Sequence, residues 1–399
     1  LQDSTFQEIL ADPKQTGIIE NVIKLKGDVL FSMIEWKAGQ EEFQAFLREL
    51  LNEYSFKNIS FEIFSQKIHD NFNLELIPLM DEWFKAKTLP GYLFSPIKAV
   101  KVKSEDKIQT MVTFKVTNFS DTDGLVKVSF RLGGGPGGGR GRGGGMGGSD
   151  VINKLVYLKP KQTKDLSYLL SVDPRMVILN TMTSKNIPQT MMSFFREIEE
   201  DTKAIPAEFE RVSDTPVQMA LPNETIVDNE DPRFAITKNE KISLLEKWIV
   251  KEKKSQSKYS GINMWRPPTN WTAITNSDFY GDYVRSAYYI KGGTGDLKAQ
   301  WHIPVKIPGY FDVYVHMYKA RMFSRGGGGG GGGDDSGEYN FTIHGDEGAQ
   351  EAVIDNKNAE NGWNHLGTYY FTSDTALVEL SNKSKLKMIF ADAVKLVEQ

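Results

Sequence analysis

The apolar residues of this chain change their spacing near Pro90-Gly91, and this change constrains the fold more than any other sequence feature. Before it, apolar residues recur at intervals of three and four, which is typical of amphipathic helices. After it, they alternate with polar residues at intervals of two, which is typical of β-strands with one buried face. The sequence therefore predicts a helical segment followed by a β-rich remainder.

Three helices are expected in the first segment. One carries an apolar face made of Phe43, Phe46, Leu47, Leu50, Leu51 and Tyr54. A second begins after Ser60, because a serine hydroxyl can accept a hydrogen bond from a free N–H group at a helix start. A third contains Leu79–Phe84, with Pro78 tolerated in its first turn.

Short strands are expected from about residue 96 onward. They lie at residues 107–118, 125–132, 151–159, 163–171, 175–181, 188–198, 297–305, 310–318 and 386–397. Asp121 and Asp123 lie between the first two, where an Asp-Gly turn explains them better than a calcium loop that lacks its other ligands. Many short strands at regular spacing indicate antiparallel sandwiches.

The predicted fold class is multidomain, α plus all-β: a helical segment followed by two antiparallel β-sandwich domains. We expect the helical segment at residues 1–93, the first sandwich at 94–205, a linker at 206–224 and the second sandwich at 225–399. Glycine-rich tracts at residues 133–148 and 326–333 each lie between expected strands. We expect both to be flexible, enlarged hairpin loops, since glycine loses the most freedom on ordering.

Several classes of chemistry lack the residues they need. The chain has no cysteine, which excludes disulfides, thiolate zinc sites and a cysteine nucleophile. It has no His-Glu-x-x-His, no Gly-x-Ser-x-Gly and no phosphate-binding loop, and its five histidines show no close metal-ligand spacing. We therefore expect no active site, no metal and no cofactor in this chain alone.

Charge and hydropathy restrict the partners. The net charge is −4 with both signs mixed along the chain, so no nucleic-acid partner is expected. No apolar run approaches the ~20 residues that span a bilayer. The first residue is Leu1, and we expect any signal peptide or anchor to lie upstream.

The segment from Tyr310 to Tyr318 is the best candidate for ligand binding. Its alternation directs Phe311, Val313, Val315 and Met317 toward a core, and it directs Tyr310, Asp312, Tyr314, His316 and Tyr318 to the other side. Aromatic rings with polar tips can stack on sugars and also form hydrogen bonds. The alternative is that these side chains pack beneath a neighbouring loop or domain. Trp301 and Trp363 are expected in the core.

The helical segment resembles the region just downstream of the zinc site in aminopeptidase-N-type metallopeptidases. The landmarks are Lys26-Gly27, Ala38–Phe43, Asn52–Phe56 and Met80–Trp83, in order. In that family a tyrosine that stabilises the oxyanion precedes the Lys-Gly pair by two positions, and here that position holds Lys24. The resemblance implies an upstream catalytic-like domain, with zinc possible only in the parent protein. The middle sandwich also resembles the β-domain of related peptidases.

The C-terminal segment resembles the golvesin C-terminal domain and the carbohydrate-binding-like module of xanthan lyases. The resemblance rests on motifs that include Tyr280–Tyr283, Pro308–Val315, Gly362–Tyr369 and Ala391–Val394, and it spans about residues 225–399 with an insertion near 235–262. Asp228 and Asp392 belong to this pattern, and we expect them to fix turns and strand ends.

Together the resemblances imply a non-catalytic scaffold in the periplasm, at the cell surface or outside a bacterial cell, binding a polysaccharide or an envelope protein. Two alternatives remain: part of an active zinc aminopeptidase whose metal site lies upstream, or a spacer without a ligand.

Overall fold

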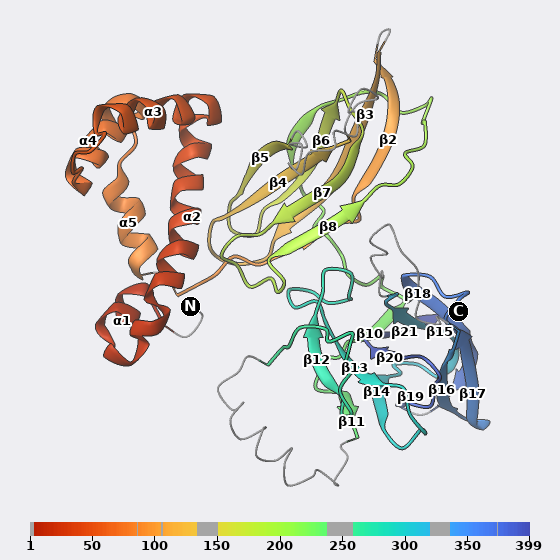
Figure 1. The fold of residues 1–399 in the computed structure, drawn as a ribbon. Coiled ribbons are helices and arrows are strands. Elements are labelled where there is room, and N and C mark those ends of the chain that lie inside the picture. Colours follow the sequence, from red (N-terminus) through yellow and green to blue (C-terminus); the bar gives the residue numbers. More distant parts are fainter. Residues whose placement is uncertain are drawn as a thin grey trace, which may run out of the picture. The chain divides into compact units, whose positions relative to one another are not determined.

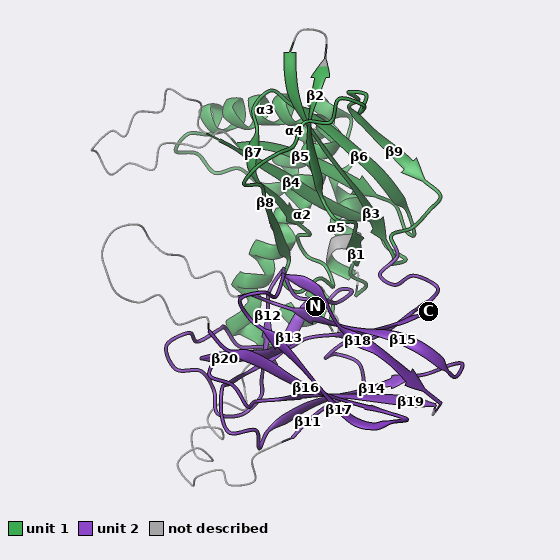
Figure 2. Cartoon of the chain, turned by 90° about the vertical axis from the view of Figure 1, so that its right-hand side faces the viewer, with its two compact units in different colours: residues 1–217 green, residues 218–399 purple. Residues whose placement is uncertain are grey.

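The computed structural model describes residues 4–85, 87–104, 107–133, 151–237, 258–319, 336–372 and 374–399. The glycine tracts, apart from Gly133, and residues 238–257 of the expected insertion lie outside the described residues. The chain divides into two compact units, residues 1–217 and 218–399 (Figure 2).

The N-terminal part is helical, as the apolar spacing predicts (Figure 1). Its helices are α1 (Phe6–Ala11), α2 (Ile19–Ala38), α3 (Gln40–Glu53), α4 (Phe61–Phe72) and α5 (Leu76–Lys85). The hydroxyl of Ser60 accepts a hydrogen bond from the N–H of Ile63 at 3.4 Å, which confirms the predicted cap. Phe43, Phe46 and Leu50 are buried, whereas Leu51, expected on the same face, is 71% exposed.

Two antiparallel sheets complete the first unit. One has the order β1-β3-β6-β9, with β2 also on β3, and the other has the order β5-β4-β7-β8. Their bounds are β1 (Tyr92–Phe94), β2 (Lys98–Ser104), β3 (Lys107–Asn118), β4 (Gly124–Leu132), β5 (Val151–Leu158), β6 (Thr163–Leu170), β7 (Pro174–Asn180), β8 (Thr190–Phe194) and β9 (Phe209–Ser213). Phe114 on one sheet and Phe130 on the other belong to one buried core.

The second unit contains three sheets, with the orders β10-β21-β15-β18, β11-β14-β19-β16-β17 and β12-β13-β20. Their bounds are β10 (Glu224–Val227), β11 (Phe234–Ile236), β12 (Thr272–Thr275), β13 (Ser286–Lys291), β14 (Lys298–Pro304), β15 (Gly309–Met317), β16 (Glu338–Gly345), β17 (Gly348–Asp355), β18 (Gly362–Phe371), β19 (Thr375–Ser381), β20 (Met388–Ala391) and β21 (Val394–Glu398). Trp301 of β14 and Val313 of β15 share the main core of this unit. The predicted fold class, a helical part followed by antiparallel sheets, is confirmed.

Two expected segments need correction. The expected linker at 206–224 contains β9, which pairs with β6. The single strand expected at 386–397 is two strands, β20 and β21, which belong to different sheets. They separate at Asp392 because β20 pairs with β13, whereas β21 pairs with β10 and β15.

The two glycine tracts have different surroundings. The first joins β4 and β5, which pair with each other from Gly124↔Leu158 to Arg131↔Val151, as expected of a hairpin. The second joins β15 and β16, which lie in different sheets, so the expectation of a hairpin there is wrong. Spacing of two identifies a strand but does not identify its partner.

Candidate binding face on the C-terminal unit

The sheet β10-β21-β15-β18 has one buried side and one outward side. Phe311, Val313, Val315 and Met317 of β15 are at most 6% exposed, so their predicted place in the core is confirmed. Residues opposite one another in an antiparallel pair point to the same side of the sheet. The outward side, which we call the outer face, therefore combines side chains of four strands: Glu224, Tyr310, Asp312, Tyr314, His316, Trp363, His365, Thr368, Tyr370 and Lys395.

One end of the outer face is accessible. Tyr310 of β15 lies directly opposite Tyr370 of β18 in the strand register. The two side chains are 61% and 38% exposed, and their rings meet edge to face with centroids 4.9 Å apart. We call this region, made of Tyr310, Tyr370, Asp312, Thr368 and His365, the open end.

Asp312 organises the polar groups of the open end. Its Oδ1 accepts a hydrogen bond from the Thr368 hydroxyl and lies 3.2 Å from His365 Nε2, and its Oδ2 accepts from the amide of Gln399. The Thr368 hydrogen bond, with the help of His365, lowers the pKa of Asp312. The carboxylate therefore stays ionised and positions neighbouring donors on an exposed surface.

The other end of the outer face is closed by Lys395, which was not among the residues predicted from the sequence. The ammonium group of Lys395 lies 5.2 Å from the ring centroid of Tyr314 and 4.8 Å from that of Trp363. It also pairs with Glu224 Oε1 at 2.8 Å, and its side chain is only 13% exposed. A cation over an aromatic ring occupies the surface that a sugar would need for stacking. The alternation Val394-Lys395-Leu396 was the available signal.

His316 also contacts other residues of its own unit. Its Nδ1 lies 2.7 Å from Asp392 Oδ2, which accepts a hydrogen bond from the Tyr280 N–H as well. Burial raises the pKa of Asp392, and His316 opposes that effect. Trp301 Nε1 donates to the Asp392 carbonyl at 3.2 Å. Asp392 thus joins β20, β21 and the loop that carries Tyr280.

Tyr318, Trp301 and Trp363 are the remaining residues for which the sequence predicted a position. Tyr318 follows the end of β15 and packs in a second small core, where its ring contacts Phe279 and Phe390. Trp301 is 1% exposed, as predicted. Trp363 is only partly buried and lies on the outer face, so its expected place in the core is wrong. Of the five candidates, four share the outer face and two lie at its open end.

An acidic cavity of about 370 Å³ lies near the closed end. Its lining includes the carboxyl groups of Asp228, Glu230, Asp231 and Asp282 together with Tyr280, whose ring contacts Trp363 at 5.2 Å. Burial, reinforced by the negative charges of Asp392, Glu230 and Asp282, raises the pKa of Asp228 to about 9. From the sequence, Asp228 and Asp392 were expected only to fix turns and strand ends, and the cavity was not predicted, because its wall comes from segments distant in sequence.

No group of three or more His, Cys, Asp or Glu side chains among the described residues is arranged to hold a metal ion. Lys24 lies on α2, where it pairs with Glu20 at 2.7 Å and its side chain is 70% exposed. None of the described helices is both long and apolar enough to cross a bilayer.

Comparison with known families bears on the C-terminal unit. Residues 260–398 match the Golvesin C-terminal domain. The match begins before β12 and ends at Glu398 in β21, and it confirms the golvesin resemblance over those residues. It covers no part of the helical segment, so the aminopeptidase-like resemblance of that segment has no support and stays a prediction. The sequence matches no curated protein.

Three solved structures show weak similarity. A Paenibacillus xanthan lyase is 15% identical with a TM-score of 0.30, over 78% of this chain and 27% of that one. A Bacteroides uniformis β-glucuronidase is 11% identical with a TM-score of 0.20, over 79% and 30%. A Paenibacillus cycloisomaltooligosaccharide glucanotransferase is 8% identical with a TM-score of 0.21, over 76% and 72%. These TM-scores are too low to establish a shared fold, and the chain spans less than a third of the first two proteins.

Proposed function

We propose that the C-terminal unit is a non-catalytic glycan-binding module of a secreted or cell-envelope protein, and that the open end of the outer face is its contact surface. The observation that carries the proposal is the exposed pair Tyr310 and Tyr370, which lie opposite each other on the adjacent strands β15 and β18. The golvesin match supports the assignment of the unit as a separate module.

The tyrosine pair supplies a surface suited to sugars. A pyranose ring presents C–H groups on its faces and hydroxyls at its edge, and aromatic rings with polar tips complement both. The edge-to-face contact at 4.9 Å restrains the two rings before a ligand arrives. A restrained surface loses less conformational entropy on binding.

Polar groups adjoin the tyrosine pair on the same face. Asp312 and Thr368 form the next opposed pair along β15 and β18, and His365 contacts Asp312. Carboxylate and hydroxyl oxygens can accept hydrogen bonds from sugar hydroxyls, and the imidazole can donate or accept. The open end therefore combines ring faces with directional hydrogen-bonding groups.

The closed end is less suited to the same role. Lys395 already lies over Tyr314 and Trp363, so stacking a sugar there requires breaking its ion pair with Glu224. Tyr310 and Tyr370 are therefore accessible to a ligand, whereas Tyr314 is already in contact with Lys395. This contrast revises the candidate tyrosines: Tyr310 is kept, Tyr370 is added, and Tyr314 and Tyr318 are dropped.

Affinity electrophoresis against a panel of soluble polysaccharides, followed by calorimetry on any that bind, tests the proposal. Tyr310→Ala and Tyr370→Ala should each weaken binding by about 1–2 kcal/mol, roughly five- to thirtyfold in Kd. Tyr310→Phe and Tyr370→Phe retain the rings and should stay within about threefold of the parent protein if stacking dominates.

Phe194→Ala is the matched control, since Phe194 of β8 is a 47% exposed aromatic residue in the other unit. It should leave binding unchanged. Binding that is insensitive to both tyrosine-to-alanine variants would remove the open end as the contact surface. If no polysaccharide in the panel binds, the glycan proposal fails and the spacer alternative is favoured.

A further inference from the structure

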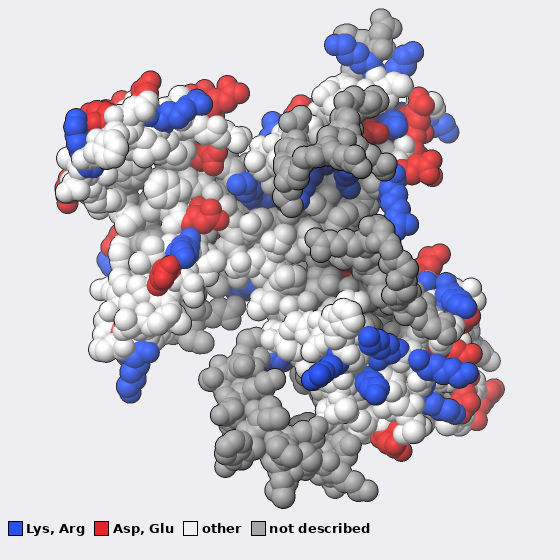
Figure 3. Space-filling model, in the orientation of Figure 1, with Lys and Arg blue, Asp and Glu red and all other residues white. Residues whose placement is uncertain are grey.

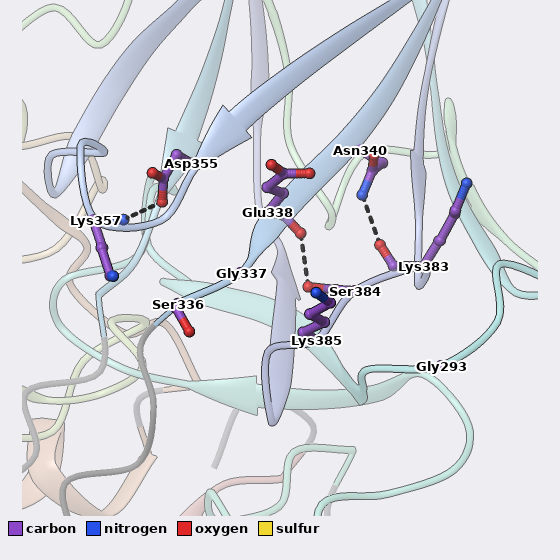
Figure 4. Close-up of a pocket in the computed structure, with 10 residues that line it drawn as sticks. All are labelled: Gly293, Ser336, Gly337, Glu338, Asn340, Asp355, Lys357, Lys383, Ser384 and Lys385. Carbon is purple, nitrogen blue, oxygen red and sulfur yellow. Dashed lines mark hydrogen bonds between the residues drawn. The ribbon is translucent and has the colours of Figure 1, made fainter.

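A larger cavity, of about 560 Å³, lies at the end of the second sheet where β16 begins and β17 ends (Figure 4). Its wall includes Glu338 and Asn340 of β16, Asp355 of β17, and the loop that follows β19. That loop carries Lys383, Ser384 and Lys385. We call this the lysine cavity, after Lys357, Lys383 and Lys385, which line it.

Hydrogen bonds hold the wall of the lysine cavity in place. The Ser384 hydroxyl donates to the Glu338 carbonyl at 2.7 Å, and the Asn340 amide donates to the Lys383 carbonyl at 2.7 Å. Gly337 lies so close to the loop that a Cβ there would be 2.9 Å from the backbone nitrogen of Leu386. The loop is therefore fixed against the start of β16, and the cavity is largely preformed.

The ammonium groups around the cavity form no ion pair with a carboxylate that the structure describes. Lys298 and Lys395 of the same unit each have a carboxylate partner, whereas Lys357, Lys383 and Lys385 have none among the described residues. Figure 4 shows Lys357 and Lys383 on opposite sides, with Lys385 between them. Asp355 Oδ1 accepts the backbone N–H of Lys357 at 2.9 Å, so that carboxylate is engaged in its own turn.

This positive charge is local. The chain as a whole carries a net charge of −4, yet three lysines face two carboxylates around the cavity. Figure 3 shows several Lys and Arg side chains over the region of β13, β14 and β20, with acidic side chains at its edge. Lysine is a compact charge on a flexible stem, so the three ammonium groups can converge on an anion.

We infer that the lysine cavity binds the anionic groups of an acidic polysaccharide, carboxylate or sulfate, beside hydroxyl contacts to Ser384, Asn340 and Glu338. The inference rests on the proposed glycan-binding function, which it narrows to a charged class of ligand. Nucleic acid is the weaker alternative. None of the described residues that line the cavity is aromatic, and single-stranded nucleic acids are usually held by base stacking.

The test compares polygalacturonate, its methyl-esterified form, dextran sulfate and neutral dextran by calorimetry with the full chain. The triple variant K357Q/K383Q/K385Q should lose at least about tenfold in affinity for the anionic polymers. The control K103Q/K107Q/K306Q removes three exposed lysines elsewhere, so it changes the net charge equally and should stay within about twofold. The comparison of polygalacturonate with dextran sulfate shows whether the cavity prefers carboxylate or sulfate groups.

The outcomes separate this inference from the proposed function. If both triple variants lose the same affinity, the attraction is non-specific. If the esterified and free polymers bind with the same affinity, charge has no role. Either result overturns the proposal that the lysine cavity is an anion site, while it leaves the proposal for the open end intact. Tighter binding of a DNA oligonucleotide than of any acidic glycan overturns the ligand class. Failure of every glycan to bind overturns both proposals together.

Discussion

Replacing Asp228 with asparagine should stabilise the C-terminal unit at neutral and alkaline pH. Burial, with the nearby charges of Asp392, Glu230 and Asp282, raises the pKa of Asp228 from 3.8 to about 9. Between these two values the folded unit holds a proton that the unfolded chain has released. The free energy of unfolding therefore falls as pH rises through this range, and asparagine removes that dependence.

The magnitude follows from the same shift in pKa. At pH 7 the ordinary pKa of an aspartate lies ~3 units below the solution pH, and each unit corresponds to about 1.4 kcal/mol, which sets a ceiling of about 4 kcal/mol. Asp228 lines an open cavity, and solvent screening there reduces the value. We expect Asp228→Asn to raise the free energy of unfolding by roughly 1–3 kcal/mol at pH 7 and by less at pH 5.

Urea denaturation of the full chain at several pH values, with hydrogen exchange of β10 and β21 peptides as a local measure, tests this. Asparagine retains the oxygen that accepts the Asn229 N–H at 2.6 Å, so the turn should survive. Asp231→Asn is the control: Asp231 lines the same cavity, but hydrogen bonds from Arg233 lower its pKa, so the variant should not stabilise. A stability difference between Asp228→Asn and the parent that stays constant from pH 5 to pH 9 would refute the reasoning.

Two further predictions concern acid stability and metal content. Burial alone would raise the pKa of Glu379, but hydrogen bonds from Lys298, Gln300 and His344 outweigh it and lower the pKa to about 2. The parent protein should therefore lose stability as pH falls from about 5 toward 2, and Glu379→Gln should flatten this loss in acid-denaturation curves while lowering stability at pH 7 by about 1–3 kcal/mol. Purified chain should contain no stoichiometric zinc and should not cleave aminoacyl-p-nitroanilides; elemental analysis finding one zinc per chain would contradict this.

Local spacing accounts for much of what could be predicted. A strand turns each successive side chain to the opposite face, so the alternation of Tyr310–Met317 was sufficient to place Phe311, Val313 and Val315 in the core. A helix start leaves free N–H groups, so Ser60 was sufficient to place the beginning of α4. Both inferences depend only on neighbours in the sequence, which is why they succeeded.

Partners distant in sequence were decided by the tertiary structure. Lys395 covers Tyr314 and Trp363 because β21, β15 and β18 lie side by side, and nothing in the spacing of any one strand indicates that order. Tyr318 continues the alternation of β15 but enters another core, because the strand ends before it.

The two cavities were also decided by the tertiary structure, because residues distant in sequence line each of them. The lysine cavity brings together residues as distant in sequence as Gly293 and Lys385, and the acidic cavity brings together Asp228 and Asp282. Sequence alone determined which segments are strands and which of their side chains point inward, since the pleat of the backbone imposes that locally. Only the folded chain determined which outward side chains remain available to a ligand, since that depends on contacts between strands that no short-range pattern encodes.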